Sequence, residues 1–481
     1  MVQNNRRLTS FLIFLVLTIS GFLISFKTLL SPLTFGEVDG YSRAIWAFNN
    51  YVNGTLLTLD KFGGAWLPLH PKILGFSILF IRDPRFGFRL ISLLFCVASV
   101  VLIYIYTERI FKSEPKKRLV ALLAAIIYLL SPLRLLLATQ PLSEPISMFF
   151  FSLILVLCSA KKVKPLYLII FINIACAIRF EFWFMVPFIW LILYIDKPKK
   201  RINYVIECLA CLIFPFYWMM INYFVSRNFF EFFSIKYSNA HKDESEVVYY
   251  NLFLASKAWV NALQDQIGMV GCFLYIFAWK LLTEKRKLVL NKKYIFVLIP
   301  VYFLLLLILQ VHWGTMEWLA PRYLFPVLIG IIPYISYGMV KFLEAIFMRI
   351  KKNSFIGWIF LGGFVLFCYG DILGVKNNIV NWKLKGSVEQ KQDVWQLVEY
   401  FKSNKIESKE IFYVEEGKSW TWVMFVFLTQ KYDIKIISLS EYFTRNFDPS
   451  TEVILTNLFL LDQNCRGKME FINKTFMVCK F

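Results

Sequence analysis

Long apolar segments recur along this chain, and short clusters of lysine and arginine separate them. A helix of about 20 predominantly apolar residues crosses a hydrocarbon core of about 30 Å, and roughly eleven segments approach that length. Hydrophobic residues make up 58% of the sequence and charged residues only 18%, whereas soluble proteins are about half apolar and about a quarter charged. The pattern therefore predicts an α-helical, polytopic integral membrane protein.

The positions of the predicted spans follow from the apolar segments and from the charges between them. The spans at 165–178 and 182–195 are short, so two tilted helices and a re-entrant hairpin both remain open for this part of the chain. The predicted spans cover residues 8–26, 89–106, 119–137, 146–160, 165–178, 182–195, 204–225, 267–282, 294–310, 323–340 and 355–369.

The net charge of +21 arises from the connectors between spans and not from one basic surface. Clusters at residues 112–118, 161–164, 197–201 and 285–293 are rich in lysine and arginine, which is typical of cytoplasmic loops. This rule places the amino terminus inside and the carboxyl end outside. We therefore expect membrane lipids as neighbours and no nucleic-acid partner.

Two regions of the chain differ in character. Residues 1–373 hold the spans and a long first outer loop at about 27–88, whereas residues 374–481 alternate between strand-like and helix-like patterns. Such alternation predicts a small extracytoplasmic α/β domain after the membrane domain. The predicted strands of this outer domain lie at residues 410–414, 433–439, 452–456 and 475–481. Cys465 and Cys479 both fall in this domain, so a disulfide between them and two free thiols both remain open.

The first outer loop carries two carboxylates in the stretch "FGEVDGYSRAIW". Glu37 and Asp39 precede an amphipathic segment with aromatic residues at helical spacing, which predicts an interfacial helix at the membrane surface. A carboxylate at this boundary can reach both a lipid headgroup and an acceptor. Solvated loop acids are the alternative. We take Asp39, just before a predicted Gly40–Tyr41 turn, and Glu37 as the catalytic candidates, with Tyr41 as a substrate-binding candidate.

The same loop contains "WLPLHPKILG", where two polar side chains stand in an apolar, proline-framed turn. His70 and Lys72 are candidates for substrate contacts. The alternative is that the Lys72 ammonium merely extends to water along its apolar stem, and that His70 makes a local hydrogen bond.

One arginine lies where the positive-inside rule disfavours it. Arg322, in "APRYLFP", opens the span at 323–340 from the outside, and a guanidinium there needs an anion such as a lipid phosphate. An ordinary phospholipid headgroup is the alternative to a substrate phosphate. We predict that Arg322 and Tyr323 contact the substrate. Arg89 is a further substrate-binding candidate, and Arg82, Arg85, Arg134 and Arg179 are weaker candidates of the same kind.

Another acid opens the span at 146–160 from the outside. Glu144 precedes Pro145 in "LATQPLSEPIS", and an acid near a helix amino terminus is favoured by the helix dipole, which is a sufficient structural account. A second substrate-facing carboxylate is equally compatible with this position.

These motifs, taken in order, resemble those of the GT-C glycosyltransferases. "GEVDGY" in the first outer loop is followed by "RFGFRLISLLFCVASVVLIYIY", "LLSPLRLLLATQPLSEPISMFFFSLILVL", "APRYLFP" and an outer soluble domain. The likeness is greatest to the branch with protein O-mannosyltransferases and bacterial aminoarabinose transferases, and it covers the first eight to ten predicted spans.

The resemblance implies roles for particular residues. It implies that Asp39 is the catalytic base, that Glu144 is a second acid, and that Arg322 binds the phosphate of a polyprenyl-linked sugar donor. In such enzymes the two acids can also hold a metal, so no cofactor and Mg²⁺ or Mn²⁺ on Asp39 and Glu144 both remain open. Glu-Val-Asp-Gly stands here where protein O-mannosyltransferases usually have adjacent Asp-Glu, so glycolipid, glycan and protein acceptors all remain open.

The expected reaction moves a sugar from a polyprenyl phosphate to an acceptor hydroxyl, on the outer face of a prokaryotic inner membrane. A carboxylate takes the hydroxyl proton, which accelerates such reactions roughly 10²–10⁴-fold, while arginine stabilises the departing phosphate. Attack from the face opposite the phosphate predicts inversion at the anomeric carbon. The alternatives are a transporter or flippase of lipid-linked glycans, a glycan polymerase or ligase, and a non-catalytic membrane scaffold.

Overall fold

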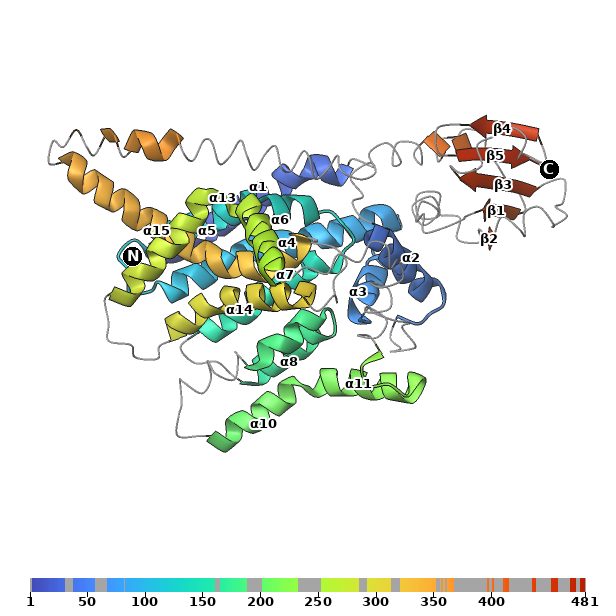
Figure 1. Cartoon of the computed structure of the whole chain (residues 1–481), viewed down its shortest axis with the longest axis horizontal. Coiled ribbons are helices and arrows are strands. Elements are labelled where there is room, and N and C mark those ends of the chain that lie inside the picture. Colours follow the sequence, from blue (N-terminus) through green and yellow to red (C-terminus); the bar gives the residue numbers. More distant parts are fainter. Residues whose placement is uncertain are drawn as a thin grey trace.

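The computed structural model describes most of the helical part of the chain and the strands that follow it (Figure 1). Statements about structure below refer to these residues. They are 2–30, 38–56, 67–81, 83–160, 165–187, 201–231, 252–284, 292–312, 321–351, 355, 358–359, 361–366, 396–397, 400–401, 410–414, 435–437, 451–456, 468–472 and 476–480.

Helices dominate the first 351 residues and pack side by side into one bundle (Figure 1). The bundle's long helices carry the apolar segments of the sequence, and short helices cover one of its ends. In order, the helices are α1 (Val2–Leu30), α2 (Val38–Val52), α3 (Leu69–Ser77), α4 (Pro84–Ile110), α5 (Lys117–Leu130), α6 (Pro132–Leu137), α7 (Ser143–Ser159), α8 (Pro165–Cys176), η2 (Phe180–Met185), α10 (Arg201–Cys211), α11 (Ile213–Ser226), α13 (Leu252–Glu284), α14 (Lys292–His312), η3 (Pro321–Leu324) and α15 (Phe325–Lys351).

Several of these helices are long and apolar enough to cross a membrane. Within the described part there are four, or up to five if the bent pair α10 and α11 counts as one span. Shorter apolar helices lie within three further predicted spans, so the integral membrane class is supported, whereas the total of about eleven stays a prediction. The four long spans are Leu8–Phe26, Phe86–Ile110, Leu252–Leu282 and Arg322–Ile350, and the shorter helices are Ser143–Ser159, Pro165–Cys176 and Ile299–Leu309.

The predicted span at 119–137 is wrong as a single helix, because a proline divides it. α5 ends at Leu130, Ser131 is extended (φ −62°, ψ 137°), and Pro132 opens α6. The residue before a proline is disfavoured in the helical region, and proline suits the first turn of a new helix. The side chain of Gln266 on α13 accepts a hydrogen bond of 2.9 Å from the backbone N–H of Leu133. The buried N–H of Leu133 therefore has a partner in spite of the break between α5 and α6.

The span expected at 204–225 is also interrupted. α10 and α11 meet at an angle of 49° around Leu212. The Asn173 amide on α8 donates 2.8 Å to the carbonyl of Ala210, and its oxygen accepts 2.8 Å from the N–H of Phe214. One side chain thus supplies partners for backbone groups on both sides of the bend, as irregular backbone at membrane depth requires.

α4 lies at the centre of the bundle and contacts α1, α5 and α7. Its buried face includes Leu93, Val97, Val100 and Ile103. At its carboxyl end, Phe111 stacks on Tyr337 of α15 with ring centroids 4.6 Å apart. α4 therefore packs mainly against α7, α5 and α1, and the stacked rings add a contact to the distant α15.

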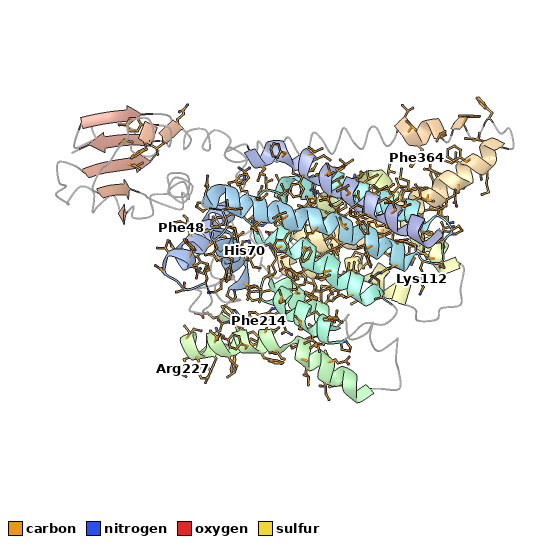
Figure 2. All side chains as sticks on the ribbon, turned by 180° about the vertical axis from the view of Figure 1, so that it is seen from behind. Phe48, His70, Lys112, Phe214, Arg227 and Phe364 are labelled. Carbon is orange, nitrogen blue, oxygen red and sulfur yellow. The ribbon has the colours of Figure 1, made fainter. Side chains whose placement is uncertain are left out.

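The two ends of the bundle differ in chemistry. Figure 2 shows Lys112 at one end and Phe48, His70 and Arg227 at the other. Ion pairs tie the Lys112 end together, with Lys116–Glu344 at 3.1 Å and Lys341–Glu114 at 3.2 Å. The basic connector and the short helices α2 and α3 thus face opposite sides, as the predicted topology requires.

α13 and α15 approach closely where Gly338 meets the backbone. A methyl group on Gly338 would collide with the carbonyl oxygen of Leu274, and neither atom belongs to a flexible side chain. We expect Gly338→Ala to lower the free energy of unfolding by about 1–3 kcal/mol, because one helix has to move. Thermal unfolding in detergent measures this. Gly362→Ala is the control, since no atom of the residues that the structure describes outside its own helix lies within 4 Å of its added methyl, and equal melting temperatures for both variants would contradict the close approach.

Five strands form one mixed sheet in the order β2-β1-β3-β5-β4. β1 pairs in parallel with β2 and β3, and β5 pairs antiparallel with β3 and β4. Parallel neighbours need crossover connections, which agrees with the expected helix–strand alternation. The boundary between the domains 1–373 and 374–481 stays a prediction. The strands are β1 (Glu410–Val414), β2 (Lys435–Ile437), β3 (Thr451–Thr456), β4 (Lys468–Ile472) and β5 (Phe476–Lys480).

The cysteines differ between the bundle and the sheet. In the described part of the bundle, six cysteines form no disulfide, including Cys208 and Cys211, a C-x-x-C pair at the end of α10. Cys479, buried on β5, is disulfide-bonded. Cys465 lies outside the described residues, so its pairing with Cys479 stays a prediction.

Candidate active site

The amphipathic segment of the first outer loop forms a helix, as expected. Asp39 is the second residue of α2, and Gly40 and Tyr41 continue the helix, so the predicted turn at this pair is wrong. Gly40 faces Pro141, with 3.5 Å between a built Cβ and the proline ring. This contact brings the amino terminus of α2 to the segment just before α7. Glu37 and the side chains of Asp39 and Tyr41 lie outside the described part.

Hydrogen bonds and a close backbone contact hold α3 against the segments that follow α8 and α2. The N–H of Leu69 donates 3.1 Å to the carbonyl of Ala177, beyond α8. The ammonium of Lys72, buried, donates 2.5 Å to the carbonyl of Thr55 after α2. A Cβ on Gly75 would meet the carbonyl oxygen of Ala47 at 2.9 Å, so α2 and α3 are in close contact. Lys72 therefore helps to hold the two short helices together, and its role toward substrate stays a prediction.

Glu144 is the centre of a buried charged cluster. It opens α7 and is 2% exposed. Its Oε1 lies 2.5 Å from Nη1 of Arg179 and 3.5 Å from Nε of Arg322. The Oε2 atom has no hydrogen-bond partner among the residues that the structure describes. Two guanidiniums from distant parts of the chain thus share one carboxylate oxygen.

Arg179 has partners along its whole guanidinium. Nε and Nη2 donate to the two carboxylate oxygens of Glu181, at 3.0 and 2.5 Å, in a two-pronged geometry. Nη1 donates to Glu144 and, at 3.0 Å, to the hydroxyl of Ser143. Because each of its three nitrogens has a partner, the guanidinium of Arg179 links the start of η2 to α7 and has a structural role in the site.

Arg322 and Tyr323 enter the same cluster from η3. The guanidinium carbons of Arg179 and Arg322 lie 5.1 and 5.3 Å from the ring centroid of Tyr323, within the range of cation–π attraction. Arg322 is 12% exposed, and its ion pair with Glu144 is longer than that of Arg179. The structure thus unites three predicted site residues, Glu144, Arg322 and Tyr323, with a weaker candidate, Arg179.

His70 and Arg43 complete the cluster. His70, on α3, is fully buried. Burial lowers the pKa of the imidazole well below 6.5, and the charges of Arg43 and Arg179 lower it further. The backbone of Leu142 acts in the opposite direction, but neither ring nitrogen has a partner at hydrogen-bonding geometry among the described residues. His70 is therefore neutral at ordinary pH.

The sequence analysis missed Arg43. It follows Asp39 by four residues on α2 and is buried, and its charge acts on both His70 and Glu144. The spacing of four residues on an amphipathic helix was a signal, since it places Asp39 and Arg43 on one face. The partner on α7, however, depends on packing between helices about 100 residues apart.

Two other arginines serve the bundle. Arg89 donates 3.3 Å to the carbonyl of Thr139. Arg134, fully buried, donates to the carbonyl of Gly21 at 3.3 Å and to the hydroxyl of Ser25 at 3.1 Å. Both arginines satisfy groups of the protein itself, and a substrate contact for Arg89 stays a prediction. Arg82 and the side chain of Arg85 lie outside the described residues.

A divalent metal does not fit the observed surroundings of Glu144. The arginines Arg43, Arg179 and Arg322 act on this carboxylate electrostatically, and two of them occupy its Oε1. A metal ion would have to approach against these positive charges. Among the described residues no group of three or more histidine, cysteine, aspartate or glutamate side chains could hold a metal.

The described cluster carries an excess of positive charge. Its three guanidiniums face two carboxylates, Glu144 and Glu181, and His70 is neutral. Counted by themselves, these five side chains carry one net positive charge, in a place that is largely removed from water. Low-dielectric surroundings strengthen electrostatic interactions, so each of these charges acts strongly on the others.

Comparisons with known proteins show likeness in fold and not in sequence. No family model matches the chain, and no curated protein matches it in sequence. Two crystal structures of ArnT from Cupriavidus metallidurans share its fold. The apo structure matches with a TM-score of 0.62 and 10% identity, over 96% of this chain and 97% of that chain. The structure bound to undecaprenyl phosphate matches with a TM-score of 0.62 and 11% identity, over 97% of each chain. The Archaeoglobus fulgidus oligosaccharyltransferase AglB, in complex with an inhibitory peptide and a dolichol-phosphate, matches at a TM-score of 0.54 and 9% identity, over 94% of this chain and 70% of that chain. The expected GT-C fold is confirmed.

Proposed function

We propose that this chain, which has the GT-C fold, is a glycosyltransferase that moves a sugar from a polyprenyl-phosphate donor to an acceptor hydroxyl at the extracytoplasmic face of a prokaryotic inner membrane. The observation that carries the proposal is the buried cluster around Glu144, where Arg179 and Arg322 share one carboxylate oxygen and Arg43 adds its charge. Solved structures of the same fold hold undecaprenyl phosphate and dolichol-phosphate, both anionic lipids. An anion site at one end of a helical bundle suits such a donor.

Arg322 is the proposed ligand of the donor phosphate. Its guanidinium retains some exposure, and it contacts Glu144 less closely than Arg179 does. Glu144 and Glu181 hold Arg179 in place, and Arg43 adds a third positive charge. Positive groups fixed before the reaction stabilise negative charge as it develops on the leaving phosphate.

Asp39 is the proposed general base, with Glu37 near it in the chain. The acceptor hydroxyl gives its proton to Asp39 while its oxygen attacks the anomeric carbon. The bond from that carbon to the phosphate oxygen breaks, and its electron pair stays on the phosphate. Attack opposite the leaving group gives inversion. The position of Asp39 at the amino terminus of α2, one turn before Arg43, supports this role.

The acceptor belongs to one of three classes, a glycolipid, a glycan or a protein. A structure of the Archaeoglobus fulgidus oligosaccharyltransferase carries a tethered acceptor peptide, so the acceptor of that enzyme is a polypeptide. A flippase of lipid-linked glycans is the competing function, and it differs in a measurable way because a flippase leaves the sugar–phosphate bond intact.

The proposed reaction can be tested with purified protein and a panel of polyprenyl-phosphate sugars. We expect release of polyprenyl phosphate with one or few of these donors, in the presence of candidate acceptors from the three classes. Thin-layer chromatography or mass spectrometry of the lipid measures the release. Movement of intact donor across a vesicle membrane without release would overturn the transferase and favour the flippase.

Arg322→Ala should weaken use of the donor far more than Arg322→Lys does. A lost charge-assisted hydrogen bond corresponds to about 1.5–3 kcal/mol, or roughly tenfold to over a hundredfold in affinity. The KM for the donor, measured by release of polyprenyl phosphate, reports the change. Arg227→Asn is the matched control, because Arg227 is exposed at the same end of the bundle and its left-handed φ of 60° suits asparagine. An unchanged KM in Arg322→Ala would remove Arg322 from the phosphate site.

A further inference from the structure

The imidazole of His70 lacks partners in a place where polar groups normally have them. It is fully buried, and neither Nδ1 nor Nε2 has a hydrogen-bond partner among the residues that the structure describes. Burying a polar atom without a partner is costly, so native proteins rarely retain such atoms without a reason. Among the described residues, no side chain hydrogen-bonds this buried ring, and only the backbone of Leu142 acts to favour its protonated form.

Positive charge surrounds the imidazole. Arg43 on α2 and Arg179 before η2 both act on it, and both disfavour its protonated form. From α4, the guanidinium of Arg89 donates to Thr139, and on α3 itself Lys72 donates to Thr55. The carboxylate of Glu144 is engaged by Arg179 and Arg322. The charges of Arg43 and Arg179 therefore help to keep one ring nitrogen of His70 unprotonated.

We propose that His70 is a proton-binding residue of the phosphate site, which is neutral in the empty enzyme and takes up one proton from solvent when a phosphate monoester binds beside Arg43, Arg179 and Arg322. The inference rests on the proposed function. An anion cancels the repulsion that the arginines exert on a protonated imidazole. Direct contact is not required, because charges in a weakly screening interior interact over several ångströms.

The reaction itself supplies a reason for such a residue. The donor phosphate is a diester with one negative charge, whereas the released polyprenyl phosphate is a monoester that carries up to two. The acceptor proton goes to Asp39 and then to water, so the product site gains one negative charge. A proton on His70 balances that charge while the product is bound, and deprotonation returns the site to its empty state when the product leaves.

The sign of the pH dependence distinguishes this role from simple anion binding. Ligand binding raises the pKa of His70, so between its free and bound values the affinity increases as pH falls, by at most about tenfold per pH unit for one proton. The ligand's own second ionisation, near pH 6 for a phosphate monoester, acts in the opposite direction, because the monoanion binds arginine less tightly. Without His70 the affinity should therefore fall as the pH is lowered.

Nuclear magnetic resonance of the full chain in detergent can observe the proton directly. The sequence has three histidines, so histidine labelling gives three ring signals. The probe is farnesyl phosphate, a short isoprenyl monoester. We expect the His70 signal to remain that of a neutral ring well below pH 6.5 without the probe, and to titrate at least about one pH unit higher with the probe bound.

Calorimetry at pH values between about 5.5 and 7.5 gives the second measurement. For wild type we expect the affinity for farnesyl phosphate to rise as the pH falls to about 6 and to level off below that, where protonation of the ligand offsets proton uptake by His70. For His70→Gln we expect the affinity to fall as the pH is lowered. His312→Gln, at the end of α14, should keep the wild-type trend. Binding with an unchanged His70 titration would overturn the proton uptake alone, whereas wild-type protein that binds no probe would overturn the proposed phosphate site. If His70→Gln does not fold, the resonance of the wild-type ring decides.

Discussion

Asp39→Asn should abolish sugar transfer while the protein remains folded and inserted. Asparagine has nearly the shape of aspartate and keeps a hydrogen-bonding oxygen, but it cannot take the proton of the acceptor hydroxyl. Removing a general base lowers rates roughly 10²–10⁴-fold. Release of polyprenyl phosphate under saturating donor and acceptor measures the loss, and an unchanged melting temperature in detergent shows that the fold is intact.

Glu37→Gln is the matched control for Asp39. Both acids lie in the same short stretch, but Asp39 is on α2, one helical turn from Arg43. We therefore expect the milder loss in Glu37→Gln. Full activity in Asp39→Asn would refute the base role, and equal, near-normal activity in both variants would show that Glu37 and Asp39 are ordinary solvated acids.

Repeating the wild-type assay with a chelator and with Mn²⁺ tests the metal alternative. Unchanged activity would exclude a metal shared by Asp39 and Glu144.

Glu144→Gln should be the most destabilising single change at the site. The carboxylate is buried between Arg179 and Arg322, and a buried charge left without its partner costs about 3–5 kcal/mol. We expect a clear drop in melting temperature in detergent together with loss of transfer.

The control for Glu144 is Glu344→Gln, at the opposite end of the bundle. Glu344 also pairs with two cations, Lys116 and Lys341, but its side chain is 28% exposed. Pairs of this kind contribute about 0–1 kcal/mol. Similar shifts in melting temperature for the two variants would show that the cluster around Glu144 is hydrated.

Helices and strands could be predicted where the residue pattern within a single segment identifies them. The expected span at 8–26 coincides with the membrane-spanning part of α1, and the expected strand at 410–414 coincides with β1. An apolar run of sufficient length and a short β-rich segment between polar turns need no knowledge of neighbours. β4 (Lys468–Ile472) was missed although polar and apolar residues alternate from Lys468 to Phe471, because a run of five residues is a weak signal by itself. Its pairing with β5, which shifts register between Met469 and Phe471, is set by the neighbouring strand.

The site could be predicted only in part, because its charges meet through packing between distant helices. Glu144 and Arg322 stood out by their position at outer helix ends, and the structure brings them within 3.5 Å. Arg134 had the same appearance, yet it donates to Gly21 and Ser25 of α1. Nothing local distinguishes an arginine that joins a charged cluster from one that completes a contact between helices. The role of Arg43 likewise depended on how α2 packs.

The contact between Arg134 and α1 also bears on how the protein is made. Arg134 and Gly21 are separated by 113 residues, and at about 5–20 residues per second the ribosome needs roughly 6–23 s to synthesise that interval. The first helix therefore enters the membrane long before the side chain that binds its carboxyl-terminal part exists. A charged arginine is unfavourable in contact with lipid, so its arrival gives a strong local reason for α1 to dock. The same guanidinium thus fixes α1 once α4 and α5 have been synthesised, and before α7 and the helices that follow it exist.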